Sequence, residues 1–130
     1  MSCEAMLKQK KVIVSLTSFP AAITFAEGAI RSILQGNTLP DKLVLYLTFS
    51  QFKNSKIPQE LTTLAKNNSL FEIRNYNEDI RSYRKLIPAL KDFPNDLIVT
   101  IDDDVSYHKN MLRDLLYLHK QIPEVIIANR

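Results

Sequence analysis

Three adjacent carboxylates, Asp102, Asp103 and Asp104, directly follow the strand-forming run at 96–101. Such a run is typical of a buried strand, and carboxylates placed after it lie at the carboxyl edge of a sheet, where open α/β folds hold their ligands. Because like charges this close repel one another, the cluster favours a bound cation. Hard oxygen donors suit Mg²⁺ or Mn²⁺ better than zinc. The pattern therefore predicts metal-assisted handling of a phosphorylated ligand.

The spacing within this cluster suggests different roles for its members. Asp102 and Asp104 are separated by one residue, so a bend after the strand would direct both toward one metal while Asp103 points elsewhere. Asp104 is the first candidate for a direct ligand. Helix capping is the simpler interpretation of one aspartate, but three in a row exceed what capping requires. His108 is close enough to be a further ligand, although a solvated histidine at a helix start is the commoner situation.

Two other segments carry polar groups suited to a phosphorylated ligand. Arg84 and Lys85 lie near the start of a predicted helix, where the helix dipole disfavours cations unless an anion is bound. A diphosphate would account for them, and so would an ordinary solvated face. The segment 17–19 offers hydroxyls and an aromatic ring that suit a base and ribose, or simply a turn before proline. With only two glycines, the chain has no Gly-rich phosphate loop, which disfavours P-loop and Rossmann-type dinucleotide binding.

The elements that would position these residues alternate along the chain. Strands are predicted at 11–16, 42–48, 70–76 and 96–101, and a fifth could begin at 125–128. Helices are predicted at 23–35, 58–66, 82–93 and 109–121, the third interrupted or kinked near Pro88. Strands that alternate with helices pair in parallel through right-handed crossovers. The sequence therefore predicts an α/β fold, with a doubly wound, mostly parallel sheet and helices on both faces.

Composition limits the class of protein. The 130 residues are 45% hydrophobic, which suits a single domain over 1–130. The net charge of +3 is modest and the basic residues are scattered, so we expect no nucleic-acid partner. The lone Cys3 fits a reducing compartment, and no apolar run approaches the ~20 residues that span a bilayer. We expect a cytoplasmic protein, and contact with the inner face of the membrane stays open.

Three segments together make the chain resemble the nucleotide-sugar-binding half of GT-A glycosyltransferases, in particular family 2-like enzymes of bacterial surface polysaccharide synthesis. These segments are 14–20 (VSLTSFP), 78–90 (EDIRSYRKLIPAL) and 98–105 (IVTIDDDV). The likeness covers nearly the whole chain and implies a Rossmann-like fold of the GT-A type. It implies transfer of a sugar from a nucleotide sugar, expected to be UDP-linked, to a cell-surface glycan or a lipid-linked acceptor.

The resemblance also implies roles for individual residues. Thr17 and Phe19 would line the nucleotide pocket, and Asp79 and Lys85 would approach the nucleotide or its phosphates. The Asp102-x-Asp104 pair would be the DxD motif, which holds Mn²⁺ or Mg²⁺ against the diphosphate, with Asp102 and the intervening Asp103 also among the donor-binding residues. The catalytic base of GT-A enzymes usually lies in the acceptor-binding half, which we expect this chain to lack. No base is assigned, and self-association through apolar surface left exposed is expected.

Two alternatives stay open. The chain could be a remnant that binds a nucleotide without turnover. Alternatively, Asp102-x-Asp104-x-Ser106 matches the nucleophilic DxDx(S/T) motif of phosphotransferases and phosphatases. That motif normally follows the first strand of its domain, whereas here it follows the fourth predicted strand.

Overall fold

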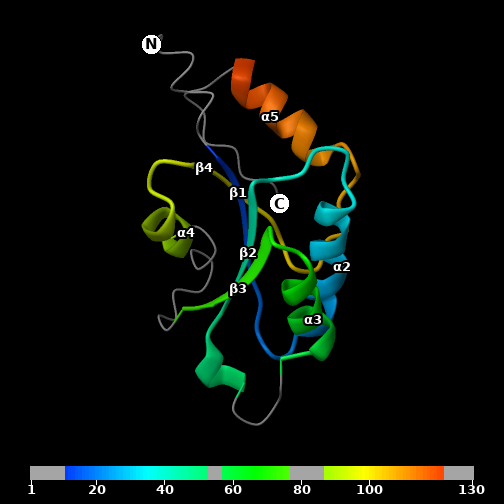
Figure 1. Ribbon diagram of the computed structural model, residues 1–130, viewed down its shortest axis with the longest axis vertical. Helices are drawn as coiled ribbons and strands as arrows, with labels where there is room; N and C mark the ends of the chain where they lie inside the picture. Colours follow the sequence, from blue (N-terminus) through cyan, green and yellow to red (C-terminus); the bar gives the residue numbers. More distant parts are fainter. Residues whose placement is uncertain (1–10, 53–56, 77–86, 122–130) are drawn as a thin grey trace.

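A computed structural model of the chain describes residues 11–52, 57–76 and 87–121 (Figure 1). The strands within this part are β1 (Val12–Thr17), β2 (Lys42–Leu47), β3 (Phe71–Asn75) and β4 (Leu97–Thr100). The helices are α2 (Ile23–Leu34), α3 (Gln59–Asn67), α4 (Ile87–Asp92) and α5 (Met111–Gln121), with a 3-10 helix, η1 (Phe49–Phe52), after β2. Strands and helices alternate, which confirms the predicted α/β class.

The strands form one parallel sheet in the order β3-β2-β1-β4. β1 lies inside the sheet, where Val14 is in register with Leu43 of β2 on one side and with Val99 of β4 on the other. The chain moves outward from β1 to β3 and then returns to the opposite side of β1 to form β4. The carboxyl ends of β1 and β4 therefore lie side by side where the strand order reverses, which is the place where doubly wound sheets bind ligands.

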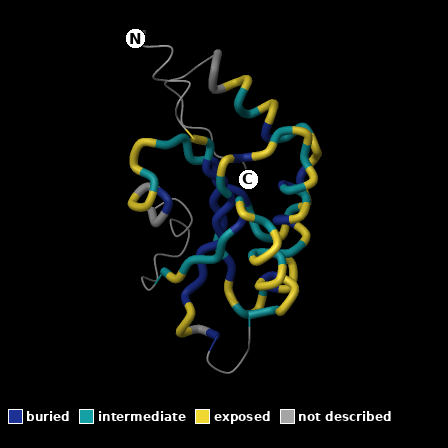
Figure 2. Tube along the Cα trace, in the orientation of Figure 1, coloured by how far each residue is buried: buried dark blue, intermediate teal, exposed yellow. Residues whose placement is uncertain are grey.

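Apolar side chains cover both faces of this sheet. Val14 and Leu16 pack with the buried residues of α2 and with Leu61 of α3, whereas Ile13 packs on the opposite face with Ala89 of α4. Figure 1 shows α2 and α3 on one side of the sheet and α4 on the other. In Figure 2 the inner strands β1 and β2 are mostly dark blue, whereas the helices carry many yellow stretches, so the core lies along the middle of the sheet. Helices on both faces confirm the doubly wound arrangement.

Short hydrogen bonds join the end of α2 to the segment that precedes α5. The N–H of Gly36 donates to the carbonyl of Ile33 at 3.1 Å, and the N–H of Asn37 donates to the carbonyl of Lys109 at 2.8 Å. The Asn37 side chain adds a 2.6 Å hydrogen bond to the Asn110 Oδ1. The end of α2 thus holds the segment just before α5 and limits where the loop after β4 can run.

Several predicted boundaries differ from those observed. The fourth strand is shorter than predicted and ends at Thr100, and α5 begins at Met111 rather than at 109. The sequence did not predict η1. Most of the predicted helix at 82–93 and the predicted strand at 125–128 lie outside the described residues. Among the described helices, none is long and apolar enough to cross a bilayer.

Candidate functional site

The ends of β1 and β4 are joined by a side-chain hydrogen bond. The Ser18 hydroxyl, one residue after β1, donates to the Asp103 Oδ2 at 2.7 Å. Ser18 is 1% exposed, so the donor side of this contact is sheltered from water. Just before it, the N–H of Ile101 donates to the carbonyl of Ser15 at 3.0 Å and extends the pairing of the two strands. The acidic segment therefore starts from a fixed position beside β1.

Tyr107 holds the same segment from its other end. Its hydroxyl accepts a hydrogen bond from the Asp102 N–H at 2.8 Å, and its own N–H donates to the Ser32 Oγ at 3.0 Å. Ser32 in turn donates to the carbonyl of Ala29 at 2.6 Å, so the contact reaches the backbone of α2. Tyr107 is a buried member of the core beneath α2. The loop from 102 to 107 is thus closed on itself and anchored to the helix.

The electrostatic character of this edge is negative. Burial raises the pKa of the Tyr107 hydroxyl, and the negative charges of Asp102, Asp104 and Asp103 raise it further. The hydrogen bond from the Asp102 N–H acts in the opposite direction. All three carboxylates are therefore near enough to the phenol to influence it, and their combined field favours a cation.

The predicted site residues differ in exposure. Asp102 and Asp103 are partly buried, and Asp104 is exposed. Thr17, the last residue of β1, is partly buried, and Phe19 is 47% exposed. The pairing of β1 with β4 and the hydrogen bond from Ser18 to Asp103 place Thr17, Phe19 and the three aspartates at the same carboxyl edge of the sheet.

Asp79 and Lys85, the other two predicted donor contacts, lie outside the described residues, so their roles stay predictions. Among the described residues, no three His, Cys, Asp or Glu side chains gather in a group that could hold a metal ion. Mg²⁺ at nucleotide sites is held by one or two carboxylates, with phosphate oxygens and waters completing the shell. The Asp102 and Asp104 carboxylates fit such a site in donor type.

His108, considered as a further ligand, has a local contact instead. It is exposed, and its Nδ1 accepts the N–H of Asn110 at 3.2 Å. The ring nitrogen thereby closes the turn that precedes α5. A histidine at a helix start was the simpler expectation for this residue, and this hydrogen bond fits it.

Ser18 was predicted only as a member of the 17–19 segment that could serve a base and ribose, and Tyr107 was not a predicted site residue. Tyr107 follows Asp102 by five residues, so both were visible as polar groups near the site. Their partners were not visible, because the Ser18 contact spans 85 residues of sequence. Only the strand order brings its two members together.

A second polar network anchors α4 to the sheet. The Tyr46 hydroxyl of β2 donates to the Asp92 Oδ2 at 2.8 Å, and the Arg74 Nη1 of β3 donates to the same oxygen at 2.8 Å. The Arg74 guanidinium carbon lies 4.9 Å from the centroid of the Phe93 ring, and Glu72 binds Arg74 from the other side at 2.9 Å. Burial, and then the bond to Asp92, raise the pKa of Tyr46. These groups fix α4, and none of them belongs to the acidic loop.

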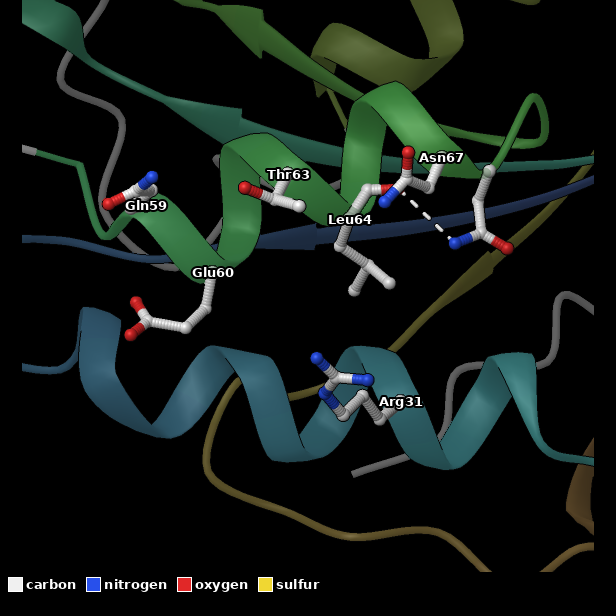
Figure 3. A pocket seen from close by; sticks show the side chains of 7 residues that line it. Arg31, Gln59, Glu60, Thr63, Leu64 and Asn67 are labelled. Carbon is white, nitrogen blue, oxygen red and sulfur yellow. Dashed lines mark hydrogen bonds between the residues drawn. The ribbon is translucent and has the colours of Figure 1, made fainter.

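A cavity of about 460 Å³ lies elsewhere, between α2 and α3 (Figure 3). Its lining residues are Arg31, Gln59, Glu60, Thr63, Leu64, Asn67 and Asn68. Arg31 is paired with Glu27, one turn earlier in α2, at 3.3 Å. None of the lining residues comes from the carboxyl ends of β1 and β4, so this cavity is separate from the acidic cluster.

No family model matches the chain, and the search of curated proteins finds no match either. A functional interpretation therefore depends on the residues and their arrangement.

Proposed function

We propose that this chain is the donor-binding portion of a metal-dependent glycosyltransferase of the GT-A type. Its donor would be a nucleotide sugar, with a UDP-linked sugar as the first expectation, and its acceptor a cell-surface glycan or a lipid-linked sugar. The observation that carries this proposal is the position of Asp102, Asp103 and Asp104. They follow β4 beside the end of β1, where the strand order reverses.

The chemistry of a nucleoside diphosphate matches the groups at this edge. Carboxylates alone would repel a diphosphate, so its recognition here requires a divalent cation between them. Asp102 and Asp104 would hold Mn²⁺ or Mg²⁺. Such a metal supplies Lewis-acid stabilisation of the negative charge that develops on a departing diphosphate. The proposal therefore requires nucleotide binding to depend on the metal.

The end of β1 would serve the nucleoside. Phe19 is 47% exposed and offers an aromatic face beside the acidic loop, and Thr17 offers a hydroxyl at the end of the strand. Stacking of a base on an aromatic ring contributes about 1–3 kcal/mol. Phe19→Ala should therefore weaken UDP binding by about tenfold or more, while leaving its dependence on the metal intact.

Calorimetric titration of UDP into the purified chain tests this proposal directly. Binding should be seen with Mn²⁺, be lost with EDTA, and be lost in Asp104→Ala. Asp114→Ala is the matched control, because Asp114 is an exposed carboxylate on α5. UDP affinity that is equal with Mn²⁺ and with EDTA, or no binding at all, would overturn the proposal.

A further inference from the structure

The three aspartates of the acidic loop are not equivalent in the structure. Asp103 accepts the Ser18 hydroxyl through Oδ2, and Ser18 is almost completely buried. This bond ties the middle carboxylate to the end of β1. Asp104, in contrast, is exposed at the outer end of the cluster.

The peptide that precedes Asp102 is fixed independently. The Asp102 N–H donates to the Tyr107 hydroxyl, and the Tyr107 backbone is bound to Ser32 of α2. One contact therefore acts on a side chain and comes from the end of β1, whereas the other acts on the backbone and comes from Tyr107 at the far end of the loop. Together they determine the direction in which successive side chains leave the chain after β4.

We propose that Ser18 and Tyr107 are positioning residues. They fix the bend after β4 so that Asp103 is turned onto β1, while Asp102 and Asp104 are presented to a divalent cation. This inference rests on the proposed function for the cation, whereas the fixed bend can be tested in the metal-free protein. The inference changes the role of Asp103. The resemblance placed it among the donor-binding residues, whereas here it is an internal anchor.

The physical reason is preorganisation. Metal ligands must be held within a fraction of an ångström of their working geometry, and groups that orient them typically change metal affinity about 10–100-fold when removed. Removing the Ser18 hydroxyl would also leave a partly buried carboxylate without this partner, which is costly in itself. Asp103→Asn keeps an oxygen that can accept the Ser18 hydroxyl, whereas Asp103→Ala does not.

The first measurement is Mn²⁺ affinity, from the electron paramagnetic resonance signal of the free ion. Ser18→Ala and Tyr107→Phe should each weaken binding by about tenfold. Asp103→Asn should weaken it less than Asp103→Ala, because the hydrogen bond is retained. Adding Ser18→Ala to Asp103→Ala should cause little further loss, since both act through one contact.

Thr48→Ala is the matched control for these variants. Thr48 also has a buried hydroxyl at the carboxyl end of a strand, and it donates to the carbonyl of Tyr76 at 2.6 Å. It lies after β2, which is separated from β4 by β1, and its hydroxyl binds Tyr76 and not the acidic loop, so its removal should leave Mn²⁺ affinity within about twofold. Equal loss of affinity in Thr48→Ala and Ser18→Ala would show a general effect on the fold and overturn the inference.

The second measurement is hydrogen exchange of the Asp102 amide in the metal-free protein. Tyr107→Phe should speed this exchange by about tenfold relative to the wild type, and Thr48→Ala should not. Unchanged exchange in Tyr107→Phe would overturn the fixed bend. If the exchange changes as expected but the wild type binds no Mn²⁺, the bend stands and the proposed function fails, together with the role of the bend in presenting a cation.

Discussion

The Ser18 hydroxyl and the Asp103 carboxylate meet at 2.7 Å, although 85 residues separate them along the chain. Their contact depends on which strand β4 pairs with. β4 pairs with β1, and not with β3 at the other side of the sheet. The loop after β4 is therefore held in place by the end of β1. The position of the acidic cluster is a property of the whole sheet and not of the local segment alone.

The two glycines should respond to substitution in opposite directions. A Cβ on Gly36 would lie 3.2 Å from the Ile33 carbonyl oxygen and 3.3 Å from the Lys109 carbonyl oxygen, and both are backbone atoms. Gly36→Ala should therefore push α2 and the segment before α5 apart and lower the free energy of unfolding by about 1–2 kcal/mol. Urea denaturation measures the difference.

Gly28→Ala is the counterpart of that variant. A Cβ at Gly28, inside α2, would meet nothing within 4 Å. Because alanine favours a helix over glycine by about 0.5–1 kcal/mol, this variant should raise the free energy of unfolding by that amount. Equal unfolding midpoints for the two variants would contradict the packing described around Gly36.

The Tyr46 hydroxyl should make the protein sensitive to alkali. Burial and the bond to Asp92 raise the pKa of Tyr46 above the ordinary value of about 10, so the folded chain keeps a proton that the unfolded chain releases. The contribution of Tyr46 to stability should be constant below pH 10 and fall as the pH rises above it.

Tyr46→Phe should reduce this alkaline loss and should cost about 1–2 kcal/mol at neutral pH, because Asp92 loses a donor. Tyr117→Phe serves as the control, since Tyr117 is 66% exposed. Unfolding midpoints measured between pH 7 and about pH 11 test both statements. If stability falls as steeply with rising pH in Tyr46→Phe as in the wild type, Tyr46 is not the group responsible for the alkaline loss.

Glu72 should contribute to stability in the acid range. Its hydrogen bond with Arg74, and then that with Lys42, hold the pKa of the carboxyl below its ordinary value, against the effect of burial. The stabilisation is therefore complete above about pH 5 and is lost as the pH falls through the lowered pKa. Glu72→Gln should cost up to about 1 kcal/mol at pH 7, because the pair is partly exposed to solvent, and less at lower pH. Glu60→Gln, an exposed glutamate on α3, is the control in acid titrations followed by circular dichroism.

The phosphotransferase alternative predicts a covalent intermediate that the proposed glycosyltransferase does not form. In that reaction the Asp102 carboxylate would attack phosphorus, displace an alcohol and form an acyl phosphate. We expect no phosphate on the protein after incubation with a phosphate monoester and Mg²⁺, as measured by intact-protein mass spectrometry. A phosphorylated wild type, with unmodified Asp102→Asn, would replace the proposed function with this alternative.

Much of the fold could be predicted from the sequence, because the signals are local. Apolar spacing and a terminal glycine predicted α2, and Pro58, which precedes the first residue of α3, marked the start of that helix. Continuous apolar runs predicted β1 and β2, since parallel strands are buried on both faces. The short η1 has no comparable period, and no pattern in the sequence indicated it.

The site could be predicted only in part, for a physical reason. Carboxylates after an apolar strand lie at the carboxyl edge of a sheet, so this part of the position of Asp102 to Asp104 followed from local pattern. Which strand becomes the neighbour of β4 depends on packing of the whole sheet. The partner of Asp103 depends on that packing as well. The same applies to Tyr46, whose partner Asp92 arrives only when α4 packs across β2.

The strand order also sets a sequence of events during synthesis. As the chain leaves the ribosome, β1, β2 and β3 emerge in the order in which they pair, so that part of the sheet can assemble early. The other edge of β1 stays open until β4 has been made, and an open edge is a template for pairing with other chains. Covering that edge of β1 and aligning the acidic loop are one event, so β1 becomes an inner strand at the moment the chain gains its candidate site.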